Sequence, residues 1–369
     1  MGCHVCHAHT HAFETGNRSS TGLHGRRRCY VHRKPATTHC RASSAKASAP
    51  DTAVLGQSGL TVSSLGIGTL QWGDTQCGYG SQYDEAQLQD VFAAAVEGGV
   101  TFFDTAEIYG YGSIKSGQSS ENLIGKFANK SQSASQQSSQ PLIVGTKFFT
   151  VPWTNLLVGG GFRLGRRSMI DALRASLKRM DRDKIDLYQI HFPFPFFKQT
   201  TLADGLQEAL DLGLASAVGV CNYNTSQLEQ IHGLLDKKGI PLATNQVKYN
   251  VLERNPEKSG LLEKCQELGV TLVAHSPLQQ GILTEKYVSG GGPKAAEKAR
   301  TLLKLMQFIG AVSGGKTVTQ VALNYLMCKG AVPIPGCKSV AQVQEHVGAM
   351  GWRLESNEIA IIDEKLQTV

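Results

Sequence analysis

Three consecutive segments, IDLYQIH (185–191), LADGLQEALDLG (202–213) and SAVGVC (216–221), decide the fold. The first and third are short, nearly continuous apolar runs, which are typical of strands buried on both faces of a sheet. The second has apolar residues at helical spacing and closes on glycine, as the C-termini of helices do. The order predicts two parallel strands joined by a helix.

The same alternation continues through most of the chain. Six further segments resemble buried strands: SSLGIG (63–68), VTFFD (100–104), LIVGTK (142–147), LATNQ (242–246), VTLVAH (270–275) and AVPIP (331–335). With the two strands above they make eight, separated by segments of helical periodicity, and we expect a (β/α)8 TIM barrel. A doubly wound open sheet is the alternative. Against it, no G-x-G-x-x-G follows the first strand, and VGGGFRLG (158–165) lacks that spacing.

The net charge of the chain is concentrated at its N-terminus. The 369 residues carry a formal charge of +7, and residues 1–50 alone contain eight Lys or Arg and one acidic residue, Glu14. The rest of the chain holds 29 basic and 29 acidic side chains, so its charges cancel. A nucleic-acid-binding function is therefore not expected. No stretch approaches the roughly 18 apolar residues that a membrane span needs.

The N-terminal segment has the composition of a targeting sequence. It is rich in Arg, Ser, Thr and Ala, and it lacks the apolar core of a secretory signal. We expect an organelle transit peptide over residues 1–50, chloroplast first and mitochondrion as the alternative, forming a disordered extension before a barrel at 54–366. The alternative is an unstructured tail that carries no targeting signal.

Cysteine and histidine are also concentrated in this segment. The cluster Cys3, Cys6, His7, His9 and His11 lacks a second set of ligands and a small core around it, so no metal site is expected. Five scattered cysteines in the remaining chain favour a reducing compartment over a disulfide framework.

Four polar residues lie at or just after the predicted ends of consecutive strands. Asp104 ends VTFFD, Tyr109 follows it in FFDTAEIYG, Lys147 ends LIVGTK and His191 ends IDLYQIH. Active groups of TIM barrels lie at these C-terminal strand ends. Taken singly, the lysine could be a solvated strand end and the histidine a hydrogen-bonded core residue.

Together the four side chains have complementary chemistry. A tyrosine hydroxyl, with its usual pKa near ~10, is a weak acid at neutral pH unless a nearby cation stabilises the phenolate. Lys147 supplies that cation, Asp104 holds the lysine in place and charged, and His191 can hydrogen-bond a substrate carbonyl. We therefore expect general acid catalysis by Tyr109.

Eight blocks of sequence, taken in order, resemble the aldo-keto reductase superfamily. They are GIGTLQWG, FFDTAEIYG, VGTKF, QIHFP, VGVCNY, NQVKYN, AHSPLQQGIL and IPGCKSVAQVQEHVGA, and the resemblance spans about residues 54–366. The chain looks most like plant and algal plastid members of the branch that includes pyridoxal reductases and potassium-channel β subunits.

The resemblance implies a function as well as a fold. It implies an NADP-dependent oxidoreductase that reduces aldehydes or ketones, with hydride from NADPH and a proton from Tyr109, reversibly to alcohol oxidation. NAD is a less favoured cofactor, and a monomer is the expected state. The alternative is a nucleotide-binding redox sensor or scaffold with little turnover, as in channel β subunits.

Cofactor contacts carry over by position. The set implied by the resemblance comprises Thr69, Asn222, Gln246, His275, Ser276, Leu278, Gly281, Lys286, Gly336, Lys338, Gln342, Glu345 and His346. Lys338 is the residue expected to favour a 2'-phosphate. Three positions depart from the family pattern, namely Cys221, His275 and His346. Cys221 would make an enzyme oxidant-sensitive if exposed, whereas a small buried residue is the ordinary explanation.

The expected substrate pocket is apolar. Aromatic residues cluster in the predicted rim loops, and we expect Trp72, Phe148, Trp153 and Phe192 to line the pocket, with Phe149, Phe194, Phe196 and Phe197 close by. The alternative is that half of these side chains pack in the core. The pattern does not choose between pyridoxal, lipid-derived aldehydes, quinones and ketosteroid-like ketones.

Overall fold

A computed structural model describes residues 51–134, 141–154 and 162–368. The expectations for residues 1–50, including the transit peptide and the Cys and His cluster, lie outside the described residues. Within the described ranges, no helix is both long and apolar enough to cross a bilayer.

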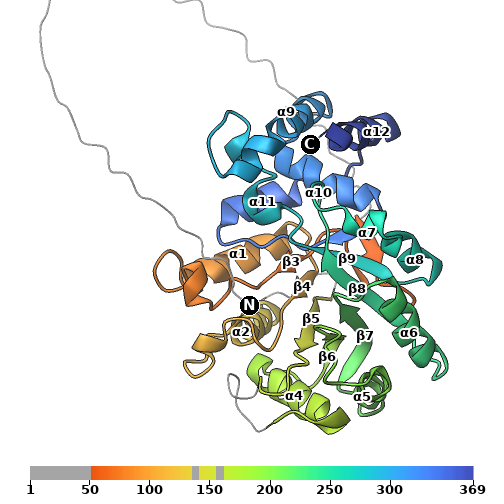
Figure 1. Ribbon diagram of the computed structural model, residues 1–369. Helices are drawn as coiled ribbons and strands as arrows, with labels where there is room; N and C mark the ends of the chain where they lie inside the picture. The colour runs from red at the N-terminus through yellow and green to blue at the C-terminus, as the bar shows by residue number, and fades with distance from the viewer. Residues whose placement is uncertain (1–50, 135–140, 155–161, 369) are drawn as a thin grey trace, which may run out of the picture. The chain divides into compact units, whose positions relative to one another are not determined.

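Eight parallel strands form one curled sheet around a central axis (Figure 1). They are β3 (Ile67–Gly68), β4 (Phe102–Asp104), β5 (Ile143–Phe148), β6 (Ile185–Ile190), β7 (Ala215–Cys221), β8 (Leu242–Lys248), β9 (Thr271–His275) and β10 (Val332–Pro333), in spatial order. The first and last strands are joined by backbone hydrogen bonds from Gly66 N–H to Pro333 (3.0 Å) and from Gly68 N–H to Pro335 (3.1 Å). The predicted (β/α)8 barrel is confirmed, and the open sheet is wrong.

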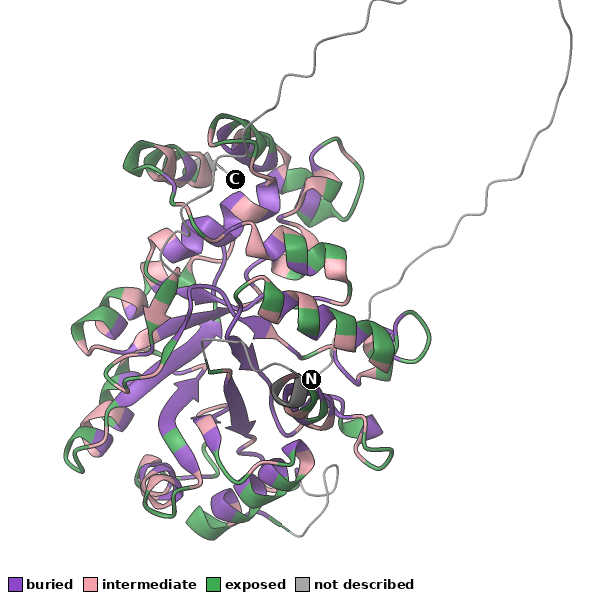
Figure 2. Cartoon of the chain, turned by 180° about the vertical axis from the view of Figure 1, so that it is seen from behind, coloured by how far each residue is buried: buried purple, intermediate pink, exposed green. Residues whose placement is uncertain are grey.

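Helices surround this sheet, and their buried faces turn inward (Figure 2). Asp84, Asn224 and Thr317 begin helices with reciprocal capping boxes, in which the side chain three positions on bonds back to the cap. The helices are α1 (Glu85–Glu97), α2 (Ser120–Ala134), α4 (Gly165–Met180), α5 (Gln199–Asp211), α6 (Thr225–Asp236), α7 (Asn255–Lys258), α8 (Leu261–Glu267), α9 (Lys294–Val312), α10 (Val318–Cys328), α11 (Val340–Val347) and α12 (Ser356–Lys365).

A short hairpin precedes the barrel and was not predicted. Strands β1 (Thr52–Val54) and β2 (Thr61–Ser63) pair antiparallel, and the predicted strand 63–68 is divided between β2 and β3. Leu55 and Val62 of the hairpin belong to a buried cluster with barrel residues such as Phe102 and Leu187. The hairpin thus buries apolar side chains against the barrel interior, away from the strand ends that carry the polar residues described next.

Candidate active site

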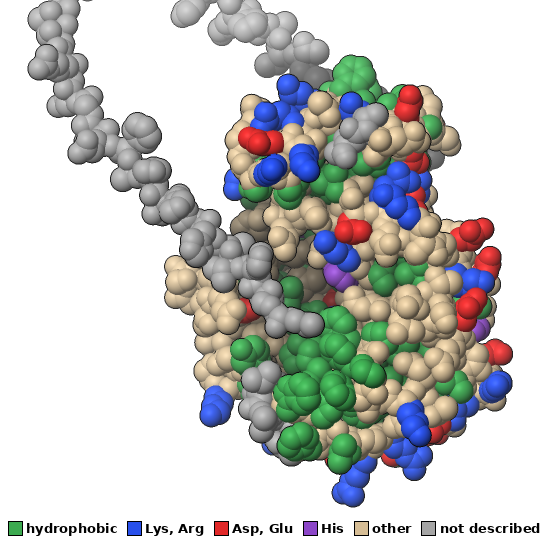
Figure 3. Space-filling model, in the orientation of Figure 1, with side chains coloured by type: hydrophobic (Ala, Val, Ile, Leu, Met, Phe, Trp, Pro, Cys, Tyr) green, Lys and Arg blue, Asp and Glu red, His purple; other side chains and the backbone are tan. Residues whose placement is uncertain are grey.

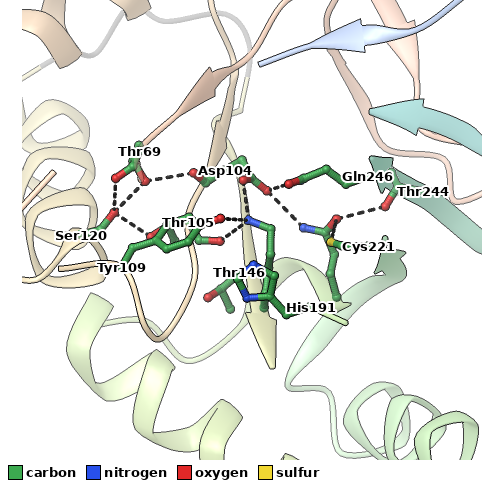
Figure 4. A network of polar contacts seen from close by, with 12 residues as sticks. Thr69, Asp104, Thr105, Tyr109, Ser120, Thr146, His191, Cys221, Thr244 and Gln246 are labelled. Carbon is green, nitrogen blue, oxygen red and sulfur yellow. Dashed lines mark hydrogen bonds and ion pairs between the residues drawn. The ribbon is translucent and has the colours of Figure 1, made fainter. Parts of the chain in front are cut away.

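Asp104, Lys147 and His191 lie together where β4, β5 and β6 end. Figure 4 labels Asp104 and His191 in this group. Asp104 is the last residue of β4, Lys147 is the penultimate residue of β5, and His191 directly follows β6. Parallel strands end at one edge of a sheet, which brings residues far apart in sequence to one place. All three side chains are buried, and Tyr109 reaches the same place from the loop after β4.

Lys147 is the centre of the polar contacts. Its Nζ donates to Asp104 Oδ2 (2.5 Å), to the Thr105 carbonyl (2.8 Å) and to Tyr109 Oη (3.4 Å). Burial alone would lower the pKa of Lys147, but the negative Asp104 and the Tyr109 hydroxyl raise it above its usual value. The lysine is therefore a fixed cation beside the tyrosine hydroxyl.

The acidity of Tyr109 reflects two opposing influences. Loss of water around its hydroxyl raises the pKa of Tyr109 to about 12, while the neighbouring Lys147 lowers it. The hydroxyl is consequently protonated throughout the neutral range and can donate a hydrogen bond or a proton. Ser120 N–H also bonds the Tyr109 carbonyl (3.1 Å), which fixes the loop.

Asp104 has more partners than the sequence suggested. Its Oδ1 accepts from Gln246 Nε2 (2.8 Å) and from Gln189 Nε2 (3.2 Å), while Oδ2 faces Lys147. Gln189 was missed, although it stands in the quoted QIHFP block. Its strand position was the available signal, since alternate residues of β6 face the barrel interior.

His191 is neutral and surrounded by rings. Burial, followed by the positive Lys147 and the nearby His275, lowers the pKa of His191 well below its usual value. Its ring stacks on Phe192 (centroids 4.8 Å apart) and meets the edges of Tyr109 and Phe149 at 5.7 and 5.4 Å. Its Nδ1 has no partner within the described part of the chain, so the imidazole keeps hydrogen-bonding capacity for a ligand.

A cluster of hydroxyl groups supports the same loop (Figure 4). Thr69 Oγ1 donates to the Asp104 carbonyl (2.9 Å) and contacts Ser120 Oγ (2.6 Å), which in turn contacts Thr105 Oγ1 (2.8 Å). Thr69 is fully buried, so its hydroxyl positions Asp104 and Thr105 in this structure.

Three of the residues expected to contact the cofactor border the cluster formed by Asp104, Tyr109, Lys147 and His191. Asn222 follows β7 with a positive φ of 62°, and its Nδ2 donates to the His191 carbonyl (3.0 Å). Gln246 lies on β8, with its amide nitrogen bonded to Asp104. His275 ends β9, its Nδ1 lies 3.1 Å from Ser276 Oγ, and burial lowers its pKa to about 4. It is uncharged at neutral pH.

The other expected cofactor residues fall into two groups. Leu278, Gly281 and Lys286 follow β9, where Leu278 is buried and Gly281 has a positive φ. The second group lies at or near α11: Gly336 bridges to Gly68, Lys338 lies over the Tyr83 ring (5.2 Å), Gln342 Oε1 accepts from Lys338 N–H (2.8 Å), Glu345 accepts from Thr317 Oγ1 (3.1 Å), and His346 is buried.

The four residues expected to line the substrate pocket lie in different surroundings. Trp72 and Phe148 are fully buried in the main core, and Trp72 Nε1 donates to the Cys337 carbonyl (3.0 Å). Trp153 is about half exposed (49%), and Phe192 is half-buried beside His191.

An aromatic row runs outward from His191. The rings of Phe192 and Phe194 lie 5.3 Å apart, those of Phe194 and Phe196 6.4 Å, and those of Phe196 and Trp153 5.5 Å. Figure 3 shows hydrophobic side chains gathered on this face of the molecule. A ligand entering here meets apolar surface beside the polar cluster.

Cys221 does not meet the condition for an oxidant-sensitive thiol. It is buried at the end of β7, and burial raises the pKa of its thiol above the usual value. A thiol with a raised pKa forms little thiolate at neutral pH. It reacts slowly because the thiolate is the nucleophile. Its Sγ lies 3.6 Å from Gln189 Oε1, within the packed interior.

The sequence model of the Aldo/keto reductase family matches residues 64–367. The chain belongs to this family. It is 39% identical over 311 residues to the chloroplastic pyridoxal reductase of Arabidopsis thaliana, covering 81% of this chain and 82% of that protein. It is 29% identical to the L-glyceraldehyde 3-phosphate reductase of Escherichia coli K12, covering 84% and 91%.

Solved structures agree with this assignment. A thermostable aldo-keto reductase crystallised with the inhibitor epalrestat superposes with a TM-score of 0.66 at 30% identity, covering 85% of this chain and 98% of that one. Family membership makes the chain an oxidoreductase that acts on carbonyl compounds.

Proposed function

We propose that this chain is an NADPH-dependent reductase of aldehydes or ketones, with Tyr109 as the proton donor. The observation that carries the proposal is the contact of Lys147 Nζ with both Asp104 Oδ2 and Tyr109 Oη at the C-terminal end of the barrel. It places a fixed cation beside a protonated phenol, and a neutral His191 lies against the same phenol ring.

The described residues fit a nicotinamide adenine dinucleotide phosphate. Asn222, Gln246 and His275 border the four-residue cluster, where a nicotinamide must lie to reach a carbonyl held there. At α11, the buried His346 has an Nδ1 without a partner among the described residues, and Lys338 offers a cation. A lysine serves as a point charge for a phosphate, so we propose that Lys338 favours the 2'-phosphate of NADPH.

The chemistry divides between the cofactor and the protein. A bound nicotinamide nucleotide supplies the hydride. Tyr109 Oη donates the proton to the carbonyl oxygen, and Lys147 stabilises the phenolate that remains. His191 hydrogen-bonds the same oxygen without adding charge, and Asp104 keeps Lys147 charged and in place. In the reverse direction the Tyr109 phenolate accepts the proton of an alcohol.

The sensor or scaffold reading is less favoured by the site. A protein that only binds nucleotide does not need the Lys147 cation beside the Tyr109 hydroxyl, or a ring-lined His191 next to it. The aromatic row from Phe192 to Trp153 supports an apolar substrate. We propose that the substrate is an aromatic or aliphatic aldehyde. We include pyridoxal because the Arabidopsis relative is named pyridoxal reductase.

The test is NADPH consumption by the full chain with pyridoxal, 4-nitrobenzaldehyde and a wider carbonyl panel. We expect turnover by the wild type, and a fall in kcat of about 10²- to 10⁴-fold in Tyr109→Phe, with the Kd for NADPH unchanged. Tight NADPH binding with no turnover of any carbonyl would establish the sensor function instead. A fully active Tyr109→Phe variant would remove the assigned proton donor.

We also propose a plastid location, which rests on the composition of residues 1–50 and on the chloroplastic relative. Fusion of residues 1–50 to a fluorescent protein tests it. Plastid import is expected, mitochondrial import would select the alternative, and a cytosolic fusion would contradict the transit peptide.

A further inference from the structure

A second buried ion pair lies beside the active site, and the proposed chemistry does not use it. Glu107 and Arg163 are each about 1% exposed, and their side chains meet in a two-pronged contact with NH1–Oε1 and NH2–Oε2 distances of 2.5 and 2.7 Å. Among the ion pairs of the described residues, only this one and Lys147–Asp104 have both side chains at most 2% exposed. Each pair has its acidic partner, Asp104 or Glu107, on the segment that runs from Asp104 to Tyr109.

The Glu107–Arg163 pair holds the main chain of one residue, Phe149. The Phe149 N–H donates to Glu107 Oε1 (2.6 Å), and Arg163 NH1 donates to the Phe149 carbonyl (3.0 Å). Phe149 directly follows β5, where ladder pairing with β4 has already ended at Asp104 and Gly145. Beyond the end of the sheet, the Glu107 and Arg163 side chains therefore hold the segment after β5 against the segment after β4.

Phe149 is in turn part of the wall of the site. Its ring meets the edge of His191 at 5.4 Å and of Phe192 at 5.7 Å. On the other side of the same segment, His191 N–H bonds the Phe148 carbonyl (2.9 Å) and Thr150 Oγ1 bonds the Phe192 carbonyl (2.7 Å). The segment after β5 is thus bonded to the His191 loop on one side and to the Tyr109 loop, through Glu107, on the other.

We propose that Glu107 and Arg163 are positioning residues that set the distance between Tyr109 and His191. Both of these side chains must reach one carbonyl oxygen, yet they stand on loops after different strands, with ring centroids 5.7 Å apart. Glu107 lies two residues before Tyr109, and Phe149 lies against His191, so the ion pair adds a buried link between the two loops. The inference rests on the proposed function, because the distance matters only if both groups act on one substrate.

Stability alone is a weak reason for such a pair. Two charges removed from water lose their hydration, and apolar residues of similar volume often replace a buried ion pair without loss of stability. An ion pair that positions reacting groups affects the reaction rate instead, because a small misplacement of these groups lowers kcat even when the protein remains folded. Removing both charges together should therefore lower kcat while the free energy of unfolding changes little.

The experiment compares two double variants of the full chain. Glu107→Leu/Arg163→Met removes the pair without leaving one charge buried. Asp51→Leu/Arg353→Met removes a similarly two-pronged pair (2.6 and 2.7 Å), between the residue preceding β1 and the segment after α11. We expect the first to lower kcat with 4-nitrobenzaldehyde by about 10- to 100-fold, with the KM for NADPH unchanged. We expect the second to keep the wild-type kcat.

Each result decides between the explanations. A folded Glu107→Leu/Arg163→Met variant with wild-type kcat overturns the proposal, as does an equal fall in both double variants. If the first does not fold, Arg163→Lys serves instead, because the compact ammonium group of lysine cannot reproduce the planar two-pronged contact that the guanidinium makes with Glu107. We expect that variant to lose about 3- to 10-fold in kcat, and wild-type kcat in it overturns the proposal. A wild type that binds NADPH but turns over no carbonyl refutes the proposed function, and the positioning role falls with it.

Discussion

Replacing Lys147 by methionine gives the sharpest test of the site, because one atom makes three separate contacts. Nζ is bonded to Asp104 Oδ2, to the Thr105 carbonyl and to Tyr109 Oη. Methionine fills much of the same volume but carries no charge. The change therefore removes the cation beside Tyr109 and leaves Asp104 buried without its counter-charge.

The size of both effects follows from the contacts. A unit charge 3.4 Å from the phenolate oxygen is worth about 5 kcal/mol at an effective dielectric constant of about 20. Losing it raises the pKa of Tyr109 further above its present value of about 12, by roughly three units or more. We expect kcat for carbonyl reduction to fall about 10²- to 10⁴-fold. Stability should fall by about 3–5 kcal/mol, since one buried charge is left unpaired.

A second variant separates these two effects. Asp104→Asn/Lys147→Met removes both charges, and the asparagine oxygen can still accept from Gln246 and Gln189. Urea unfolding should show most of the lost stability restored, while NADPH oxidation with 4-nitrobenzaldehyde should stay as slow as in Lys147→Met. Recovery of activity in the double variant, or a Lys147→Met kcat within about threefold of the wild type, would refute the role of Lys147 as the cation that stabilises the Tyr109 phenolate.

Two further predictions concern Lys338 and His346, which we propose to lie at the cofactor site near α11. Lys338→Met should weaken binding of 2',5'-ADP about tenfold and leave binding of 5'-ADP unchanged in calorimetry, whereas equal weakening of both would contradict a 2'-phosphate contact. His346→Asn should flatten the pH dependence of stability: burial lowers the pKa of His346 from its usual 6.5 to about 4, so its stabilising contribution is present above pH 6.5 and lost as the pH falls to about 4. The loss in the wild type amounts to roughly 3 kcal/mol, and urea midpoints that change with pH identically in both proteins would contradict it.

The eight strands could be predicted because burial on both faces leaves a continuous apolar run. IDLYQIH and SAVGVC show this directly, and their observed strands are Ile185–Ile190 and Ala215–Cys221. The hairpin β1–β2 was missed because its strands are three residues long, and Leu55 and Val62 are its fully buried members of the apolar cluster inside the barrel. A strand pattern of only three residues cannot be distinguished from the sequence of a loop.

The candidate catalytic residues could be expected from position, and the aromatic residues could not. A strand end fixes where Asp104, Lys147 and His191 must lie, whatever the surrounding loops do. An aromatic side chain in a loop can turn either way, and Trp72 turns into the core while Trp153 faces solvent. Nothing in the local sequence distinguishes these two tryptophans, because the packing partners that bury Trp72, such as Phe127, come from a distant helix.

The segment FFDTAEIYG illustrates what sequence reasoning left out. Asp104 and Tyr109 were identified in it, but Glu107 stands between them and its partner Arg163 is 56 residues away, beyond any local pattern. A flexible loop would let the Tyr109 hydroxyl move relative to Lys147 and His191, and a proton donor that moves is a poor catalyst. The buried carboxylate of Glu107 ties this loop to the neighbouring strand end, while Ser120 holds the Tyr109 carbonyl. The nine residues thus contain both the proposed acid and a means of keeping it in place.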